Sequence, residues 1–309
     1  MLLVAHYDVF GLENKDFNQH YEQVSLFLLA YDIKQAQIVA DSLRAVAVND
    51  EQRIRANMLS AKVYFAKGDV GDAIKHAMKA NEIAHGEHYT KWQTITSGFL
   101  ATAFRVIGLL KASERYLTIA QQANEAAAQE PLYMVTKTNL LHEGALHRFN
   151  SKDFTAAETM LQEARQFIVH DLVEREKSTL LKATNSLLLG YCYLHLDQLA
   201  LADDMLQETL QLIGDVKSDL LPYTYWSIAE IEMKKGNLQK AYDYLNLTLP
   251  YLESLGVDEL KAVVYQSFVA YYLKLGDLDR SNNYSLKAIA LEKIRSIWQS
   301  RFLINYLKI

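Results

Sequence analysis

The chain has 309 residues, of which 50% are hydrophobic and 22% are charged, and its formal net charge is -5. This balance is typical of a soluble globular protein, and a negative charge without a run of Lys and Arg argues against nucleic-acid binding as the main role. The single cysteine, Cys192, excludes an intramolecular disulfide, and no apolar run approaches the roughly 20 residues of a membrane span.

The first predicted hairpin follows an N-terminal stretch, residues 1–16, that we expect to be irregular or a short helix. Only 3 prolines and 12 glycines occur in the chain, which favours long helices. Apolar residues recur with a helical period over residues 17–31. Asp32 is expected to cap a second helix that carries the small residues Ala36 and Ala40. The two helices form a degenerate copy of a helical hairpin.

The stretch Ser60–Ala80 contains the clearest pattern of a helix, a tight turn and a second helix. Gly68 is expected to end the first helix with a positive φ angle, which glycine adopts without steric cost. Small residues mark the contact between the helices, with Ala61 on the first and Ala73 and Ala77 on the second. Neither helix can bury its apolar face alone, so the hairpin requires copies of itself.

Copies of this hairpin recur along the chain at intervals of 37 to 45 residues. Each copy has a small residue on its first helix, which we use as a reference position, and another on its second helix. The predicted reference residues are Ala61, Ala101, Ala145, Gly190, Ala229 and Val269. The predicted small residues of the second helices are Ala36, Ala73, Ser113, Ala157, Ala202, Ala241 and Ser281.

The segment Leu189-Gly190-Tyr191-Cys192-Tyr193 has the form Leu-Gly-x-x-Tyr, with Ala202 following on the next helix. This pattern resembles the tetratricopeptide-repeat superfamily, whose period is about 34 residues, over roughly residues 17–290. The resemblance implies an all-α, right-handed superhelical solenoid of about seven helix-turn-helix repeats, forming one domain over residues 1–309. The longer period is similar to sensor regions of bacterial signalling regulators, where such arrays accompany helix-turn-helix activators, peptide-pheromone receptors, histidine kinases or diguanylate cyclases.

The C-terminal stretch, residues 283–309, is predicted to be a helix longer than a repeat requires, with an apolar stripe that includes Trp298 and Phe302. Terminal repeats usually turn a polar face outward. One interpretation is a capping helix folded over the last repeat. The other is a segment that leads into an effector domain, or a contact through which two copies form a homodimer, since exposed apolar stripes mark interfaces.

The sequence contains no arrangement of residues that predicts catalysis. His85 and His88 have a metal-ligand spacing but lack a third well-placed ligand, so a solvated loop is the alternative. His142 and His147 are five residues apart and so do not share a helix face as a zinc-protease pair would. Cys192 lies in the repeat motif and is expected to be apolar filler. We therefore predict a protein that is not an enzyme and needs no cofactor or metal.

Binding remains as the expected activity, on the inner wall that the first helices form in such a solenoid. Counting from the reference residue, positions −6, −3, +1 and +4 lie on one face of each first helix. On this stripe, aromatic residues supply contact area, amides can bond a peptide backbone, and the basic residues can meet a carboxylate. The candidate ligand-binding residues are Lys62, Arg105, Asn139, His142, Tyr191, Tyr223, Trp226, Glu230 and Gln266.

The alternative for this stripe is that much of it packs against neighbouring helices, where aromatic side chains are often found. The two-carboxylate clamp of the superfamily uses Lys and Asn at −3 and +1 in adjacent repeats. Only Lys62 fits that pattern here, so a clamp for chaperone tails is not favoured.

Three functions follow in order of preference. The first is the ligand-sensing region of a bacterial regulator that binds a peptide or small ligand on the concave face. The second is a constitutive protein–protein scaffold or chaperone adaptor, and the third is an enzyme. We expect protein or peptide partners, no nucleic-acid or membrane contact by this region, and a cytoplasmic location, or a periplasmic one if a signal or membrane segment has been removed.

Overall fold

The computed structural model describes residues 15–29, 32–86, 89–129, 132–168, 175–214, 218–254 and 258–306, without the side chains of residues 294–306 and of a few residues at the ends of the other ranges. The described residues form fourteen helices and no strand, which confirms the all-α helical repeat. In chain order the helices are α1 (Lys15–Leu29), α2 (Ile33–Val46), α3 (Asp50–Ala66), α4 (Val70–Gly86), α5 (Thr90–Val106), α6 (Leu110–Ala126), α7 (Tyr133–Asn150), α8 (Phe154–Ile168), α9 (Arg175–His195), α10 (Leu199–Ile213), α11 (Leu220–Lys235), α12 (Leu238–Ser254), α13 (Asp258–Lys274) and α14 (Leu278–Tyr306).

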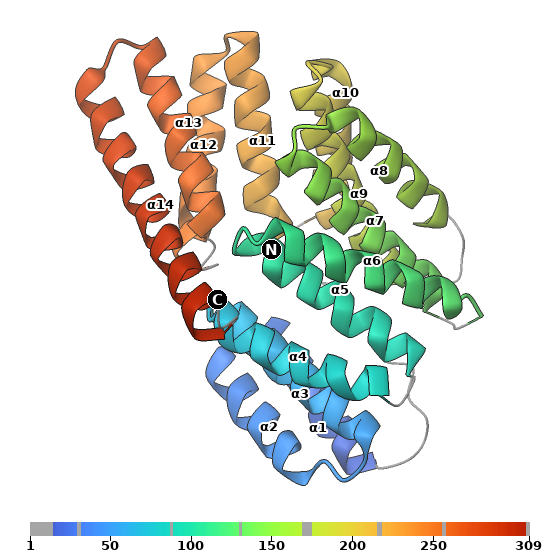
Figure 1. The fold of residues 1–309 in the computed structure, drawn as a ribbon. Helices are drawn as coiled ribbons and strands as arrows, with labels where there is room; N and C mark the ends of the chain where they lie inside the picture. Colours follow the sequence, from blue (N-terminus) through green and yellow to red (C-terminus); the bar gives the residue numbers. More distant parts are fainter. Residues whose placement is uncertain are drawn as a thin grey trace. The chain divides into compact units, whose positions relative to one another are not determined.

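The helices are grouped into two compact units, whose main segments are Val4–Glu143 and Gly144–Asn305. In the N-terminal unit the hairpins α1–α2, α3–α4 and α5–α6 follow one another (Figure 1). In the C-terminal unit α9 packs on α10 and α11 packs on α12. First helices also contact the next first helix, as α3 does with α5 and α11 with α13. Side chains of successive first helices are therefore brought side by side within each unit.

The turn inside the hairpins has a recurring backbone geometry. In each of the six hairpins from α3–α4 to α13–α14, an amide N–H in the turn bonds the carbonyl five residues earlier at 2.8 to 3.0 Å, as Asp69 does to Tyr64, which is the bond that closes a helix in a Schellman motif. The residue before each of these amides has a positive φ. Four are glycines, including Gly68 at 83°, but Lys152 and Asp197 adopt φ angles of 58° and 60°. The left-handed turn thus persists where glycine is missing.

The small residues predicted on the second helices all lie at packed contacts. From Ala36 to Ser281 they are at most 4% exposed, and Ala73 has no exposed surface. A side chain on Gly190 would meet Leu206, because a Cβ atom there would lie 2.7 Å from Cδ2 and 2.8 Å from Cγ of that residue. Close approach of two helices thus explains the small residues, and Val269 departs from the pattern because it is only half-buried.

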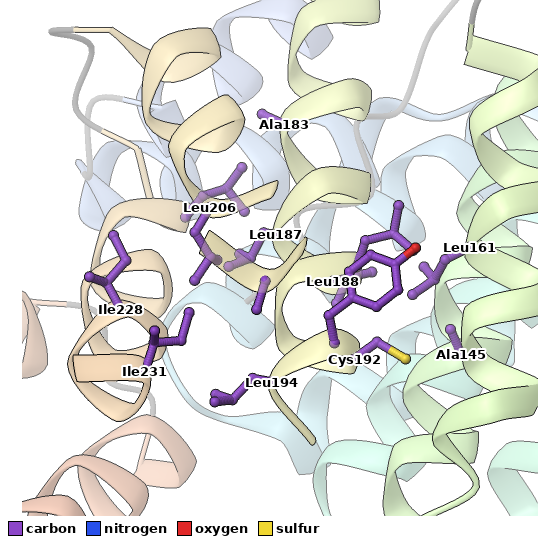
Figure 2. Packing of buried hydrophobic residues seen from close by; sticks show 14 of the residues in the cluster. Ala145, Leu161, Ala183, Leu187, Leu188, Cys192, Leu194, Leu206, Ile228 and Ile231 are labelled. Atoms are coloured by element: carbon purple, nitrogen blue, oxygen red, sulfur yellow. The ribbon is translucent and has the colours of Figure 1, made fainter. Parts of the chain in front are cut away.

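The core of the C-terminal unit fills the space between hairpins. Leu161 of α8, Leu189 of α9 and Leu206 of α10 have no exposed surface, and Figure 2 shows several members of this cluster converging around α9. Burial of each such leucine contributes roughly 1.5–3 kcal/mol relative to an exposed side chain. Cys192 lies in the same cluster and is buried, as expected for apolar filler (Figure 2).

Most predicted boundaries agree with the structure to within a few residues. Asp32 caps α2 by accepting the N–H of Gln35 at 3.1 Å, as expected. The long C-terminal helix begins at Leu278 rather than near residue 283, because it is continuous with the second helix of the last hairpin. The expectation for residues 1–14 and the apolar stripe of residues 294–306 fall outside the described side chains. Within the described part of the chain, the helices are all too short or too polar to cross a membrane.

Candidate functional site

The candidate site is the row of side chains on the first helices that point toward the next first helix. We call this row the first-helix face and define it by positions −6, −3, −2, +1 and +4 relative to the reference residue. Each unit has its own part of this face. In the N-terminal unit it comes from α3, α5 and the start of α7, and in the C-terminal unit from the end of α7, α9, α11 and α13.

The first-helix face of the N-terminal unit contains an ion pair between two side chains of the protein. Arg105 of α5 donates to Glu143 of α7, with 2.5 Å between Nε and Oε1 and 3.3 Å between Nη2 and Oε2. The hydroxyl of Thr102 donates to the same carboxylate at 2.9 Å. The side chains of Arg105 and Glu143 are 13% and 7% exposed. Arg105 was predicted to meet a ligand carboxylate, whereas the structure pairs it with a carboxylate of the protein.

Next to this pair the N-terminal face is aromatic. Phe65 of α3 packs edge-on against Phe99 of α5, with 5.5 Å between the ring centroids. Lys62, the other basic candidate, is half-buried one turn before Phe65 on α3. The structure therefore leaves part of the Lys62 side chain at the surface, where it was predicted to be.

The first-helix face of the C-terminal unit is a row of aromatic rings. Tyr191 of α9 lies between Phe149 of α7, at 4.9 Å between centroids, and Trp226 of α11, at 5.7 Å. All three side chains are half-buried, so each keeps some surface in contact with solvent. The structure thus brings together two of the predicted residues, Tyr191 and Trp226, from neighbouring repeats.

A serine of the next helix fixes two side chains of α11. The Nε1–H of Trp226 donates to Oγ of Ser267 at 2.9 Å, and the hydroxyl of Ser267 donates to Oε1 of Glu230. Trp226 and Glu230 are four residues apart and hence share a face of α11. Burial raises the pKa of Glu230, and this effect outweighs the opposing influences of Ser267 and Lys234. Glu230 is therefore a carboxyl group whose charge is poorly solvated.

Histidine and phenylalanine extend the aromatic row at the end of α9. The ring of His195 stacks on Phe154 at 4.4 Å and meets Tyr191 edge-on at 4.4 Å. Burial, followed by the charges of Lys234 and Lys152, lowers the pKa of His195 below its ordinary 6.5. His195 is therefore mostly neutral at pH 7, and it adds aromatic surface without adding positive charge.

The remaining predicted residues differ in exposure. Tyr223 and Asn139 are half-buried, and Gln266 is exposed and donates to Glu292 at 3.4 Å. His142 is only 3% exposed, because its side chain lies inside the packing of α7. Burial lowers the pKa of His142 to about 3, which keeps the ring neutral. Of the nine predicted residues, His142 is the one that the helix packing withdraws almost completely from the surface.

Three residues of the face escaped the sequence prediction because they occupy position −2. These are Phe99, Glu143 and Ser267, each of which contacts position +1 or +4 of the preceding first helix. Position −2 lies three residues before +1 and four after −6. A helical period of 3.6 therefore places it on the same face, and this spacing was a signal in the sequence.

The structure gives little support to a cysteine nucleophile or a metal site. Burial raises the pKa of the Cys192 thiol to about 12, and the thiol donates to the carbonyl of Phe154 at 3.0 Å. Such a thiol is a poor nucleophile. No group of three or more His, Cys, Asp or Glu side chains suited to a metal occurs among the described residues. Glu87 and His88, part of the predicted His85–His88 pair, lie outside them.

The fold is similar to that of several solved structures, although no family model and no curated protein matches the sequence. NprR in complex with its cognate peptide NprX is 14% identical, with a TM-score of 0.66 over 96% of this chain and 84% of that one. The apo form of RapI is 13% identical, with a TM-score of 0.62 over 90% and 98% of the two chains.

A third similar structure is a signal transduction ATPase with numerous domains and a tetratricopeptide repeat sensor, from Pyrococcus horikoshii. It is 16% identical, with a TM-score of 0.56 over 93% of this chain and 50% of that one. At these identities the likeness concerns the fold. The chain has an all-α helical-repeat fold similar to the folds of NprR, RapI and this tetratricopeptide repeat sensor protein.

Proposed function

We propose that this chain is a non-catalytic, peptide-binding repeat domain that serves as the ligand-sensing region of a bacterial regulator. The first-helix face is the binding surface. The observation that carries this proposal is the row of half-buried aromatic and polar side chains from α7 to α13. The likeness to NprR, which was solved with its cognate peptide, supports the same interpretation.

The chemistry of the row suits an extended peptide. Tyrosine and tryptophan supply large contact area with few rotatable bonds, which makes them frequent hot spots in interfaces. The amides of Asn139 and Gln266 can bond both the N–H and the C=O groups of a peptide backbone. Among the predicted ligand contacts, Tyr191, Tyr223, Trp226, Glu230 and Gln266 all belong to the C-terminal unit, so we place the main contacts there.

Replacement of Trp226 by Ala tests this proposal. We expect it to weaken peptide binding about 30-fold, because truncation of a central aromatic hot spot costs about 2 kcal/mol or more. Binding is measured by fluorescence anisotropy with pooled synthetic pentapeptides of mixed sequence that carry a dye. Tyr89→Ala is the control, because Tyr89 is 36% exposed and lies before α5, outside the first-helix face.

Two results would contradict the proposal. If the unmodified chain binds no pool, the first-helix face is not a general peptide-binding surface. If Trp226→Ala lowers the helical circular-dichroism signal, Trp226 is a core residue and its loss of binding is indirect. Small-angle scattering with and without peptide then separates a sensor, whose dimensions change, from a scaffold, whose dimensions stay the same.

A further inference from the structure

Glu230 carries a charge that the described residues do not neutralise. The ion pairs of the described side chains do not include Glu230, and its hydrogen-bond partner is the neutral hydroxyl of Ser267. Lys234 lies one turn further along α11, but its Nζ bonds Oδ1 of Asp197 at 2.8 Å. Lys235 bonds Asp203 at 2.9 Å. The nearby lysines therefore pair with other carboxylates.

The groups around Glu230 are aromatic. Trp226 shares its helix face and its Ser267 partner, and Tyr191 packs against Trp226 with 5.7 Å between the ring centroids. Beyond Tyr191 lie Phe149 and the neutral ring of His195. A half-buried carboxylate beside several ring faces combines the two features that attract an organic cation, a countercharge and aromatic quadrupoles.

The arrangement is also held in place before any ligand arrives. Ser267 bonds both Trp226 and Glu230, and its hydroxyl lies 3.0 Å from the carbonyl of Val263 on its own helix. Side chains fixed by such bonds lose little conformational entropy when a ligand binds. An acceptor that is already oriented and poorly solvated gains more from a cation than a mobile surface carboxylate does.

We propose that Glu230, Trp226 and Tyr191 form a subsite for the side-chain cation of a lysine or arginine in the bound peptide. This inference rests on the proposed function, since it names the residue class that one position of the peptide carries. The ammonium or guanidinium group donates to the Glu230 carboxylate, and the aliphatic part of the side chain lies along the rings of Trp226 and Tyr191.

The N-terminal unit supports this assignment by contrast. There the carboxylate of Glu143 also accepts a hydroxyl, that of Thr102, but it is additionally paired with Arg105 at position +4. In the C-terminal unit the residue at +4 is Met233, which is 5% exposed and uncharged. In this proposal a cation of the ligand pairs with Glu230 in the way that Arg105 pairs with Glu143.

The test uses pools of N-acetylated, C-amidated pentapeptides with lysine, arginine or norleucine fixed at the centre and mixed residues elsewhere. We expect the unmodified chain to bind the lysine and arginine pools about tenfold more tightly than the norleucine pool. Glu230→Gln keeps the acceptor for Ser267 and removes the charge, so this preference should vanish while the norleucine pool still binds. Glu163→Gln on the second helix α8, where Glu163 is exposed, is the matched control and should keep the preference.

The outcomes separate this inference from the proposed function. Equal binding of the three pools overturns the cation subsite and leaves peptide binding intact. A preference that survives in Glu230→Gln assigns the cation to another residue and also overturns it. A norleucine pool with a free α-amino group tests whether the bound cation is the N-terminus of the peptide instead of a side chain. If only that pool gains affinity, the subsite binds the peptide N-terminus and the side-chain assignment is wrong. Absence of binding to every pool overturns both proposals.

Discussion

The two units use the same positions of the repeat for different chemistry. In both, position +1 of one first helix meets position −2 of the next through a hydroxyl and a carboxylate. In the N-terminal unit the hydroxyl is Thr102 and the acid is Glu143, whereas in the C-terminal unit the acid is Glu230 and the hydroxyl is Ser267. Arg105 neutralises the first acid. The second acid shares its serine partner with the indole of Trp226 instead.

This difference separates a carboxylate with a counterion in its own chain from a carboxylate without one among the described residues, in the equivalent contact between first helices. A buried carboxylate that is paired with a cation of its own chain contributes to a defined packing arrangement. A half-buried carboxylate without such a cation costs stability, and that cost is offset if a ligand supplies the charge. Under the proposed function, the N-terminal pair is structural and the C-terminal cluster is the part of the face that binds the ligand.

The largest effect is expected from Arg105→Met, which gives the N-terminal unit the residue that Met233 provides in the C-terminal unit. Removal of the cation leaves Glu143 buried without its ion-pair partner, and such a change typically costs about 3–5 kcal/mol. The free energy of unfolding, measured by urea denaturation, should fall by that amount. Peptide binding at the C-terminal unit should change little in the fraction that remains folded.

The double variant Arg105→Met/Glu143→Gln is the control for this prediction. It removes the unpaired charge and should recover most of the lost stability. A loss below about 1 kcal/mol for Arg105→Met alone would place the pair among ordinary surface salt bridges and would remove the contrast between the units.

An intermediate effect is expected from Ala73→Leu, which tests what the two units share. Ala73 has no exposed surface at the contact between α3 and α4, so three extra carbons must displace their neighbours. Overpacking of this kind costs roughly 1–3 kcal/mol, which is measured by thermal or urea unfolding. Gly190→Ala is the matched change in the C-terminal unit, where the new Cβ would meet Leu206. If Ala73→Leu leaves stability unchanged, the alignment of the repeats is wrong.

The smallest effect is expected in the pH dependence of stability. Because the pKa of Glu230 is raised in the folded chain above its ordinary 4.5, the folded state binds this proton more tightly than the unfolded state does. The contribution of Glu230 is therefore most favourable below the unfolded pKa and is lost as the pH rises through the folded value. Urea unfolding from pH 4.5 upward should show this loss in the unmodified chain relative to Glu230→Gln. Parallel curves for the two proteins would show that Glu230 is well solvated.

The helical pattern could be predicted because it is local. Small residues such as Ala73 and Gly190 recur wherever two helices of a hairpin touch, and turn positions such as Gly68 recur five residues before the small residue of the second helix. Two turns lack glycine, at Lys152 and Asp197, and each still lies five residues before the predicted small residue of its second helix, Ala157 or Ala202. The reason is that a hairpin is specified by many residues at once, so the loss of one signal leaves the others.

Individual site residues were harder to predict because exposure depends on how successive repeats pack. His142 shares its predicted face with Trp226 and occupies the same position −3, yet packing buries the first and leaves the second half-exposed. Arginine is a residue type that often binds a ligand carboxylate. Only the position of Glu143 across the helix interface shows that Arg105 is already paired within the protein.

The sequence by itself determined the repeat, its small contact residues and the face on which binding residues were to be sought. All of these follow from the periodicity of single helices and hairpins, which the order of residues specifies directly. The tertiary structure alone decided which acid on that face has a counterion and which does not. The partners of Glu143 and Glu230 lie 37 to 41 residues away in the sequence, and they meet only after neighbouring hairpins have packed.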